Sequence, residues 1–428
     1  MTRRLRYGMV GGGPGAFIGD VHRTAAELDG LARIEAGAFS SDPERSAAKG
    51  AEIGLDAERT YGSFAEMAAA EAGRPPDRRL DFVIVVTPNH LHFDVARTFL
   101  EAGFHVVCDK PLTTTVSEAE TLCRIVDAGD RVFALTHNYS GYPMIKDARA
   151  LVREGRLGAI RRIQLEYFQG WLSTALEESG HPQAAWRTDP ARAGVAGALG
   201  DIGTHAHHLA RYVTGLEVEA LCGDLTAFVA GRRLEDDASL LMRWSGGVRG
   251  TMTVSQVAAG EENGLALRVF GSEGSIAWHH SDAETLWLRT PDGRARARRR
   301  GHAWISPAAA GHPGFRPVTR RGSSRGSRTC TATSSPRSGR STRGGRRTRA
   351  RSTSPRWATG RAAFTSWSGR SKAAAAVSGS MRATRHPESQ PRNGGSRRDE
   401  HTTDHAVHGP VGGHAARDAG RESGRLGV

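Results

Sequence analysis

Near its N-terminus the chain has an apolar run, a glycine-rich turn and a predicted helix, in that order. Residues 5–10 read as a short buried strand, Gly11-Gly-Gly-Pro-Gly follows, and a helix is expected over about 20–28. Glycines let the backbone approach a pyrophosphate closely, and the positive end of a helix dipole favours its negative charge. The stretch therefore predicts a strand–turn–helix unit that binds a dinucleotide.

The spacing of these glycines departs from the usual G-x-G-x-x-G fingerprint. Gly11 and Gly13 fit its start, while the third position is either Gly19, which comes late, or Ala16. Cofactor contacts are predicted here for Gly11, Gly13, Ala16, Phe17 and Ile18.

The second predicted strand, over 33–39, leads to Ser40 and Ser41. An acidic residue at this tip would bind the ribose 2′-hydroxyl of NAD, whereas serines together with Arg45 suit the 2′-phosphate of NADP. Asp42 lies nearby but can instead cap the next helix. We expect Ser40, Ser41 and Arg45 to contact the cofactor, and the choice between NAD and NADP stays open.

Two further strand ends carry polar motifs. The apolar run 81–86 reads as a parallel strand covered on both faces and ends at Thr87-Pro-Asn-His-Leu-His92, while strand 105–108 ends at Asp109-Lys110-Pro111. Lys110 can stabilise a developing alkoxide, although a surface lysine before a proline would look the same. Helices 93–102 and 116–128 and a strand over 131–136 continue the alternation. Because ligands bind at the carboxyl ends of such strands, cofactor contacts are predicted for Thr87, Pro88, Asn89, His92, Asp109 and Lys110.

The segment Gly200-Asp-Ile-Gly-Thr-His205 places an acid and a histidine four residues apart. In a helix Asp201 and His205 would face the same way, and a carboxylate can orient an imidazole and favour its use as a general base. A capped amphipathic helix that begins with polar residues has the same spacing, so spacing alone does not decide.

Taken together, V-G-G-G, T-P-N-H-L-H, C-D-K-P-L and G-D-I-G-T-H resemble the glucose–fructose oxidoreductase/inositol dehydrogenase/MocA (Gfo/Idh/MocA) family over about residues 5–310. The resemblance implies that Lys110, Asp201 and His205 are catalytic, with the substrate carbinol between the lysine and the histidine. His205 would take the hydroxyl proton, Asp201 would orient His205, and Lys110 would polarise the oxygen. Asp109 replaces the glutamate of the family's E-K-P motif.

The function implied is NAD- or NADP-dependent oxidation of a secondary alcohol on a sugar, inositol or related polyol. The alternative is a non-catalytic NAD(P)-binding regulator or sensor of a sugar operon. Substrate contacts are expected at the domain crossover and in the second domain. Asn138 and Tyr139 could equally form a structural turn, and Arg187 could equally pair with Asp189. The predicted substrate-binding residues are Asn138, Tyr139, Trp186, Arg187 and His205.

The predicted fold is an α/β Rossmann domain with a doubly wound parallel sheet over 1–138. An α+β domain over 139–311 follows, with a large, mostly antiparallel open sheet. Turn glycines separate its strands, which are expected at 160–168, 217–226, 238–244, 248–256, 266–270, 275–278 and 285–288. The resemblance implies that this sheet joins copies into a homodimer or homotetramer.

Several classes of protein are disfavoured by the composition. His205, His207 and His208 lack a cysteine or carboxylate at zinc spacing, and the four cysteines are scattered, so no metal is predicted. The sequence has no apolar run of about 18 residues and no signal-peptide pattern. We expect a cytoplasmic protein with no membrane partner.

The net charge of +14 comes from the C-terminal part. Residues 301–428 contain 24 of the 59 lysines and arginines but only 6 of the 45 acidic residues. Basic tails often bind nucleic acid. We prefer to interpret residues 312–428 as translated out of frame. Back-translated in a shifted frame, 317–333 and 354–367 can encode peptides that resemble the family's C-terminal helix and D-G-x-R motif.

In the remaining frame, residues 399 onward resemble the start of a sugar-phosphate isomerase/epimerase. We therefore predict a loosely ordered tail and no nucleic-acid partner. Loss of the family's C-terminal helices would expose apolar surface and endanger stability and activity.

Overall fold

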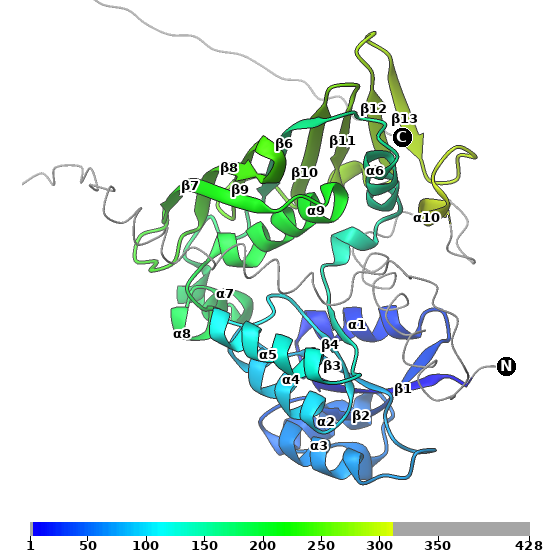
Figure 1. Ribbon diagram of the computed structural model, residues 1–428. Coiled ribbons are helices and arrows are strands. Elements are labelled where there is room, and N and C mark those ends of the chain that lie inside the picture. The colour runs from blue at the N-terminus through cyan, green and yellow to red at the C-terminus, as the bar shows by residue number, and fades with distance from the viewer. Residues whose placement is uncertain (1–2, 311–428) are drawn as a thin grey trace, which may run out of the picture. The chain divides into compact units, whose positions relative to one another are not determined.

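The computed structural model describes residues 3–310, so the predictions made for the tail lie outside the described residues. A five-stranded parallel sheet with the order β2-β1-β3-β4-β5 forms the N-terminal part (Figure 1). Its strands are β1 Leu5–Gly11, β2 Ala32–Ala38, β3 Phe82–Val86, β4 His105–Cys108 and β5 Phe133–Leu135. The strand order reverses between β1 and β3, and ligands bind at such a point.

The helices of this part follow the strands in the expected alternation. They are α1 Phe17–Glu27, α2 Pro43–Glu52, α3 Phe64–Ala72, α4 His92–Glu101 and α5 Val116–Ala128. The side chains of β3 pack alternately on the two faces of the sheet. Ile84 belongs to the buried cluster that includes Ala26 of α1. Val83 and Val85 belong to the cluster that includes Phe99 of α4. Both faces are covered, which explains why β3 is apolar throughout.

An eight-stranded sheet forms the second part, with the order β13-β12-β11-β10-β6-β9-β8-β7. β6 and β9 run parallel, and the other neighbouring strands run antiparallel. The strands are β6 Ile160–Phe168, β7 Val218–Thr226, β8 Asp237–Trp244, β9 Arg249–Ser255, β10 Gly264–Gly271, β11 Ser275–His279, β12 Thr285–Arg289 and β13 Ala295–Arg299.

Helices cover one face of this sheet. α6 Pro143–Arg153 and α9 Thr204–Thr214 lie along the same side of the strands (Figure 1). Leu240 and Met242 of β8 are buried in the cluster that these helices complete, whereas Leu241 between them is 65% exposed. The strand therefore shows the alternation of an antiparallel sheet with one open face.

The predicted fold, a Rossmann domain followed by a mostly antiparallel sheet, is confirmed. β13 was not predicted, because its sequence alternates alanine and arginine and carries no apolar signal. None of the helices within residues 3–310 is long and apolar enough to cross a membrane. The short α10 Pro307–Ala310 ends the described chain.

Candidate active site

The glycine turn after β1 lies against the end of β3. Gly11 has a φ of +86°, and a Cβ there would lie 2.7 Å from the carbonyl oxygen of Val86. A Cβ on Gly13 would lie 2.7 Å from the carbonyl oxygen of Phe39, beyond the end of β2. Side chains are therefore excluded where the turn passes between these strands. Without Cβ atoms at these positions, a ligand can approach the backbone closely at the switch point.

Gly19, and not Ala16, is the residue that lets α1 pack closely against this turn. A Cβ on Gly19 would lie 2.6 Å from the Cα of Gly12, whereas Ala16 is the residue preceding the helix. α1 begins at Phe17, earlier than predicted, because no side chain caps it and the sequence has no cap to mark its start. Its first N–H groups have no side-chain cap, and the hydroxyl oxygen of Thr87 is buried without a partner. The residues present fit a dinucleotide whose pyrophosphate faces the helix N-terminus.

The tip of β2 presents serine hydroxyl groups, and the nearby acidic side chain, Asp42, is already hydrogen-bonded. The hydroxyl of Ser40 accepts from the Asp42 N–H at 3.1 Å. Oδ1 of Asp42 accepts from the N–H groups of Glu44 and Arg45. Asp42 thus caps α2, which is one of the two alternatives predicted for it. Ser41 and Arg45 are exposed beside it.

Two of the predicted cofactor residues join loops inside the chain. His92 is 1% exposed, and its ring nitrogens lie 2.6 Å from the Pro111 carbonyl oxygen and 2.9 Å from that of Thr87. The amide of Asn89 donates to the carbonyl of Ala193, in α8 Pro190–Ala193, at 3.1 Å. One N–H of the Asn89 amide is used, and both ring nitrogens of His92 face carbonyl oxygens. Direct cofactor contact in this turn stays a prediction for Thr87, Pro88, Asn89 and His92.

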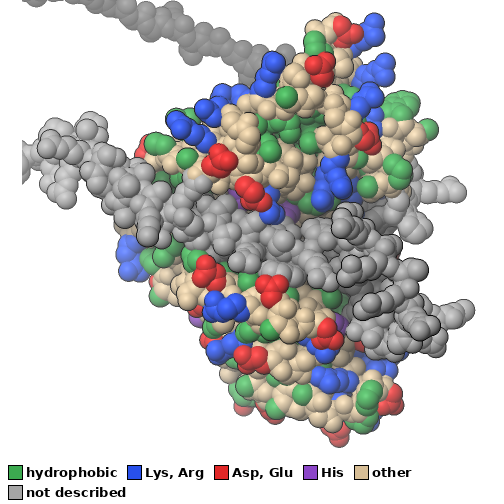
Figure 2. Space-filling model, viewed as in Figure 1, with side chains coloured by type: hydrophobic (Ala, Val, Ile, Leu, Met, Phe, Trp, Pro, Cys, Tyr) green, Lys and Arg blue, Asp and Glu red, His purple; other side chains and the backbone are tan. Residues whose placement is uncertain are grey.

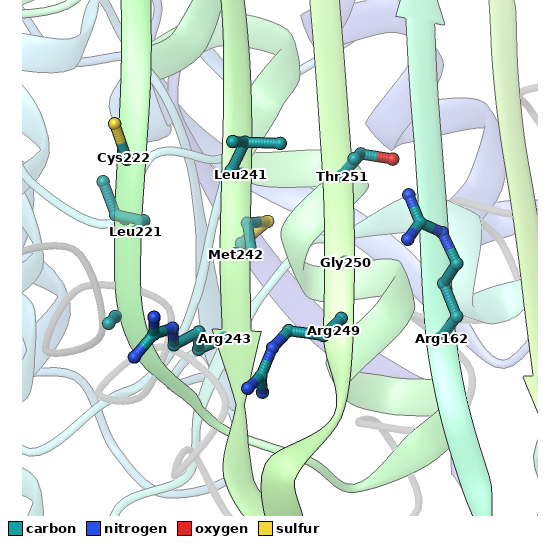
Figure 3. A pocket seen from close by; sticks show the side chains of 10 residues that line it. Arg162, Leu221, Cys222, Leu241, Met242, Arg243, Arg249, Gly250 and Thr251 are labelled. Atoms are coloured by element: carbon teal, nitrogen blue, oxygen red, sulfur yellow. The ribbon is translucent and has the colours of Figure 1, made fainter.

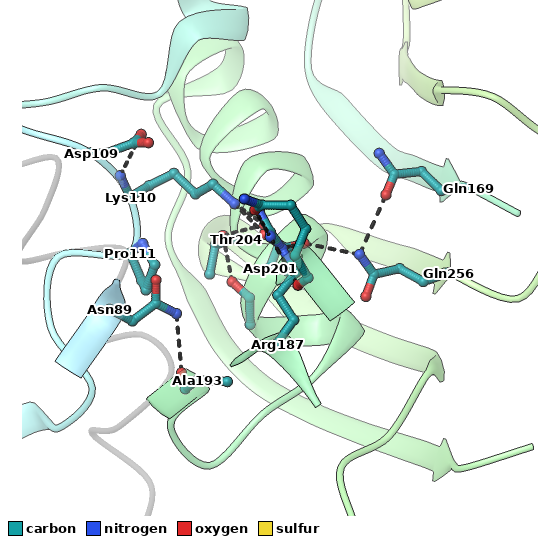
Figure 4. Close-up of polar contacts among 12 residues, drawn as sticks. Asn89, Asp109, Lys110, Pro111, Gln169, Arg187, Ala193, Asp201, Thr204 and Gln256 are labelled. Carbon is teal, nitrogen blue, oxygen red and sulfur yellow. Dashed lines mark hydrogen bonds and ion pairs between the residues drawn. The ribbon is translucent and has the colours of Figure 1, made fainter. Parts of the chain in front are cut away.

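Lys110 receives its support from an unexpected acid. Oδ1 of Asp109 accepts from the Lys110 backbone N–H at 2.8 Å and from the Thr136 hydroxyl at 3.1 Å, so Asp109 orders the turn. The Lys110 ammonium instead donates to Asp201, to Oδ1 at 2.5 Å and to the backbone carbonyl at 2.7 Å (Figure 4). An ammonium has three N–H donors, so these bonds leave one for another ligand.

Asp201 lies on a π-helical turn, Leu199–Gly203, that leads directly into α9. Besides Lys110, its carboxylate accepts from Nε of Arg187 at 3.2 Å and from Nε2 of Gln256 at 2.9 Å. Burial alone would raise the pKa of Asp201. The charges of Lys110 and Arg187, with the hydrogen bonds from Lys110 and Gln256, outweigh burial and hold the pKa well below its usual range. The carboxylate is therefore ionised at neutral pH.

The expected pair between Asp201 and His205 is not formed. Two cationic groups and one amide take the carboxylate, and charge-assisted bonds of this kind are stronger than a bond to a neutral imidazole. His205 is 8% exposed, and its Nδ1 is buried without a hydrogen-bond partner. Its ring contacts those of His137 and Tyr139, with centroids 5.5 and 5.0 Å away, and is nearly perpendicular to both.

The electrostatic environment keeps His205 neutral. Burial, the nearby charge of Lys110 and the neighbouring His137 lower its pKa well below the ordinary value. A neutral imidazole can accept a proton, which a general base requires. Lys110 thus supplies a hydrogen-bond donor. His205, whose pKa the charge of Lys110 lowers, supplies a proton acceptor.

The predicted substrate residues of α7, Pro182–Arg187, are at this site. Arg187 pairs with Asp201 and not with Asp189, which caps α8, so the predicted alternative pairing was wrong. The Arg187 guanidinium lies 4.1 Å from the Trp186 ring centroid and 5.7 Å from that of Trp171. The two rings restrict this guanidinium through cation–π contacts.

Several polar residues at the site were missed from the sequence. Gln169 directly follows β6, Gln256 directly follows β9, and Asn263 precedes β10. Because β6 and β9 run parallel, their carboxyl ends meet at the same edge of the sheet. Knowledge that β6 and β9 pair in parallel would have placed the two glutamines together. Sequence periodicity does not reveal which strands pair, so the glutamines were missed.

Asn138 and the neighbouring histidines have other surroundings. Asn138 is half-buried at the start of the turn Asn138–Gly141. His207 stacks on Trp244, and His208 stacks on His137. Within residues 3–310 no three histidine, cysteine or acidic side chains gather as a metal site would require.

The open face of the eight-stranded sheet carries the second feature of interest. Leu241, Thr251 and Arg162 lie on neighbouring strands around a depression of about 500 Å³ (Figure 3).

The surface charge of the described residues is mixed. Over the face seen in Figure 2, acidic and basic side chains are interspersed on the Rossmann part. Residues 1–300, which span the Rossmann part and the second sheet, hold 35 lysines and arginines against 39 acids and so have no basic excess.

Comparison with known proteins places both parts of the chain in one family. Residues 5–137 match the oxidoreductase family with an NAD-binding Rossmann fold, and residues 145–277 match the GFO/IDH/MocA C-terminal domain. An uncharacterized oxidoreductase of Bacillus subtilis is 36% identical over 289 residues, which are 67% of this chain and 73% of that protein. Levoglucosan dehydrogenase of Pseudarthrobacter phenanthrenivorans is 27% identical, over 74% of this chain and 84% of that protein.

Solved structures agree with these sequence relatives. An oxidoreductase from Sinorhizobium meliloti is 39% identical with a TM-score of 0.76, over 88% of this chain and 98% of that one. An inositol dehydrogenase homologue from Azotobacter vinelandii, solved with NAD⁺, is 32% identical with a TM-score of 0.73, over 88% of this chain and 90% of that one.

Proposed function

Because the chain belongs to the Gfo/Idh/MocA family of NAD-binding oxidoreductases, we propose that it oxidises a secondary alcohol on a sugar, inositol or related polyol. That it is an NAD(P)-dependent dehydrogenase follows from the family. The observation that carries the proposed oxidation of an alcohol is the position of the Lys110 ammonium. Asp201 holds it by two bonds, and its charge acts on neutral His205.

Each of these residues has a separate role in the proposed reaction. His205 accepts the proton of the substrate hydroxyl, since its imidazole is neutral and its Nδ1 has no hydrogen-bond partner. Lys110 donates its remaining N–H to the same oxygen and stabilises the developing negative charge. Asp201 positions Lys110 through two hydrogen bonds, in place of the predicted bond to His205.

The cofactor would lie along the switch point between β1 and β3. The turn at Gly11 and Gly13 and the N-terminus of α1, with Ala16, Phe17 and Ile18, would hold the pyrophosphate. When bound, the nicotinamide supplies the hydride acceptor. Ser40, Ser41 and Arg45 would meet the ribose, and with Asp42 bonded as a helix cap they favour the 2′-phosphate of NADP. Residues 1–138 thus serve the cofactor, and residues 139–311 serve the substrate.

The substrate class is supported by the groups that remain free at the site. Among the described residues, Nη2 of Arg187 and Oε1 of Gln256 have no hydrogen-bond partner, so they offer two N–H donors and an acceptor oxygen. Trp171 and Trp186 add apolar surface beside them. Donors, acceptors and aromatic faces together suit a polyhydroxylated ring. Levoglucosan dehydrogenase and the inositol dehydrogenase homologue bear names of the same substrate class.

We also propose that copies of the chain associate through the open sheet face. Leu241 is 65% exposed and Trp287 is 39% exposed. Arg162, Arg249 and Arg243 are direct neighbours across β6, β9 and β8, and adjacent like charges are unfavourable without a partner. Contact with a second copy would cover the leucine.

The reading frame of residues 312–428 remains a separate proposal. Resequencing the locus would contradict it if the frame shown were found intact and homologous tails were basic too. A frame-corrected chain should gain thermal stability if it restores the C-terminal helices that the family resemblance implies.

Activity on a panel of polyols and sugars, with NAD⁺ and with NADP⁺, tests the proposed function. Formation of reduced nicotinamide with at least one polyol is the expected result. Tight cofactor binding without turnover on any polyol would instead favour the non-catalytic regulator, which finds no support in the names of these relatives.

A further inference from the structure

Asn263, a residue outside every motif discussed above, is hydrogen-bonded to two tyrosines. The Tyr167 hydroxyl donates to Oδ1 of Asn263 at 2.6 Å, and Nδ2 of Asn263 donates to the Tyr139 hydroxyl at 3.1 Å. The two hydroxyls lie 2.6 Å apart. Since the Tyr167 proton points to Asn263, Tyr139 must donate to Tyr167. The three side chains therefore form a closed ring of hydrogen bonds.

This ring decides what Tyr139 can do. Its hydroxyl is used twice and is buried, so the predicted direct contact with substrate would require the ring to open. Its aromatic face instead lies 5.0 Å from the His205 ring and perpendicular to it. His205 has no hydrogen bond to Nδ1, so ring contacts are what hold its orientation. Asn263 fixes Tyr139, and Tyr139 borders His205.

A second branch runs from Asn263 to the other half of the site. Gln169 donates from Nε2 to Oδ1 of Asn263 at 3.0 Å. Gln256 donates from Nε2 to Oε1 of Gln169 at 3.4 Å and to Oδ2 of Asp201 at 2.9 Å. Asp201 in turn holds Lys110 (Figure 4). The amides are thus oriented in series, from Asn263 to the lysine.

The hydrogen-bonding capacity of Asn263 is fully used. Oδ1 accepts from Tyr167 and Gln169, while Nδ2 donates to Tyr139 and to Nδ1 of His280, the latter at 3.1 Å. An asparagine amide has two donors and two acceptor positions, so none is left. An isosteric aspartate would place an acceptor opposite the Tyr139 oxygen and break the ring of bonds.

We propose that Asn263 is a positioning residue that fixes both His205, through Tyr139, and Asp201, through Gln169 and Gln256. The inference rests on the proposed function, because it assigns Asn263 to the same reaction. It deepens that function by placing the common support of base and lysine in the substrate domain, outside the family motifs.

The test compares Asn263→Asp with the full-length parent chain. Loss of the ring should lower kcat about 100-fold, because a catalytic group displaced by about 1 Å costs that much. The NADPH dissociation constant, measured by fluorescence, should stay unchanged, because Asn263 directly precedes β10 of the second sheet and lies outside the Rossmann part. Asp147→Asn is the matched control. Asp147 is fully buried and bonded to Arg298, away from this network, so its loss should lower stability but not kcat.

Histidine proton resonances give a readout that needs no turnover. The groups around His205 are Lys110, Asp201, Asp109, His137, His208 and the two tyrosines. In Asn263→Asp the titration of His205 should move towards that of an ordinary histidine, through solvation of a loosened ring and through the negative charge of the new carboxylate. Tyr139→Phe keeps the aromatic ring, removes the hydroxyl and adds no charge, so a smaller change in the same direction isolates the effect of solvation. The same variant serves if Asn263→Asp does not fold.

Two results would overturn the proposal. One is an unchanged kcat and His205 titration in a folded Asn263→Asp chain. The other is an equal fall in kcat in Asp147→Asn, which would make the effect one of stability. If the parent chain oxidises no polyol, the proposed function fails, and the His205 titration still decides the role of Asn263.

Discussion

Buried neutral histidines should make this protein sensitive to mild acid, and His207 isolates the effect. His207 is 6% exposed and stacks on Trp244, with ring centroids 5.8 Å apart. Burial and the charge of Arg211 lower the pKa of His207 to about 4. Burial, Lys110 and His207 lower the pKa of His137 to about 3. Both side chains are therefore neutral in the folded protein at pH values where an unfolded chain would protonate them.

The sign and size follow from proton linkage. An unfolded histidine has a pKa of about 6.5, so below that pH the unfolded chain binds a proton that the folded chain does not. Stability is thus complete above about pH 6.5 and falls as the pH drops towards the folded pKa. At about pH 5 the loss is about 2 kcal/mol for each of these two histidines. Since native proteins have about 5–15 kcal/mol of stability, two such groups remove a large part of it.

The assay is urea unfolding of the parent and of His207→Phe, each at about pH 7.5 and about pH 5. Phenylalanine keeps a ring against Trp244 and cannot bind a proton, so the variant should lose about 2 kcal/mol less between the two pH values. His90→Gln, at an exposed position, should behave like the parent. An equal loss in the parent and in His207→Phe would refute the reasoning. Absolute stability is not the readout, because the substitution changes packing as well.

Three further perturbations address the remaining parts of the account. Lys110→Met should lower turnover by about 100-fold or more with little change in cofactor affinity, measured by steady-state kinetics and fluorescence titration; a pure rise in KM would instead assign Lys110 to substrate binding. Ser40→Asp should shift the ratio of NADPH to NADH affinity about tenfold towards NADH, because a carboxylate repels the 2′-phosphate; an unchanged ratio would place the ribose elsewhere. Leu241→Asp should weaken self-association in sedimentation velocity, while Asp292→Asn, on an exposed turn, should not; equal behaviour of the two would remove the open face as the interface.

Local sequence signals predicted the elements whose ends are marked by side chains. The bounds of α5 were predicted correctly, and Thr115 and Glu118 form a capping box at its start. β6 was also predicted correctly, because its inward side chains alternate with polar ones. The start of α1 was wrong because no side chain caps it, and β13 was missed because arginine and alanine carry no apolar pattern.

The site was predictable as a set of residues but not as a set of contacts. The motifs named Lys110, Asp201 and His205, yet the predicted bond from Asp201 to His205 is replaced by bonds to Lys110 and Arg187. That choice depends on cations that lie far from Asp201 along the chain or on another helix. Asn263 gave no signal, because a single asparagine before a strand reads as a turn residue.

Turnover of His205→Ala at saturating polyol and cofactor tests the central claim most directly. Removal of the general base should lower kcat by about 100- to 10,000-fold, while the cofactor dissociation constant stays the same. A kcat that matches the parent would show that another group takes the proton, and the roles assigned here to His205 and to its supports would fall together.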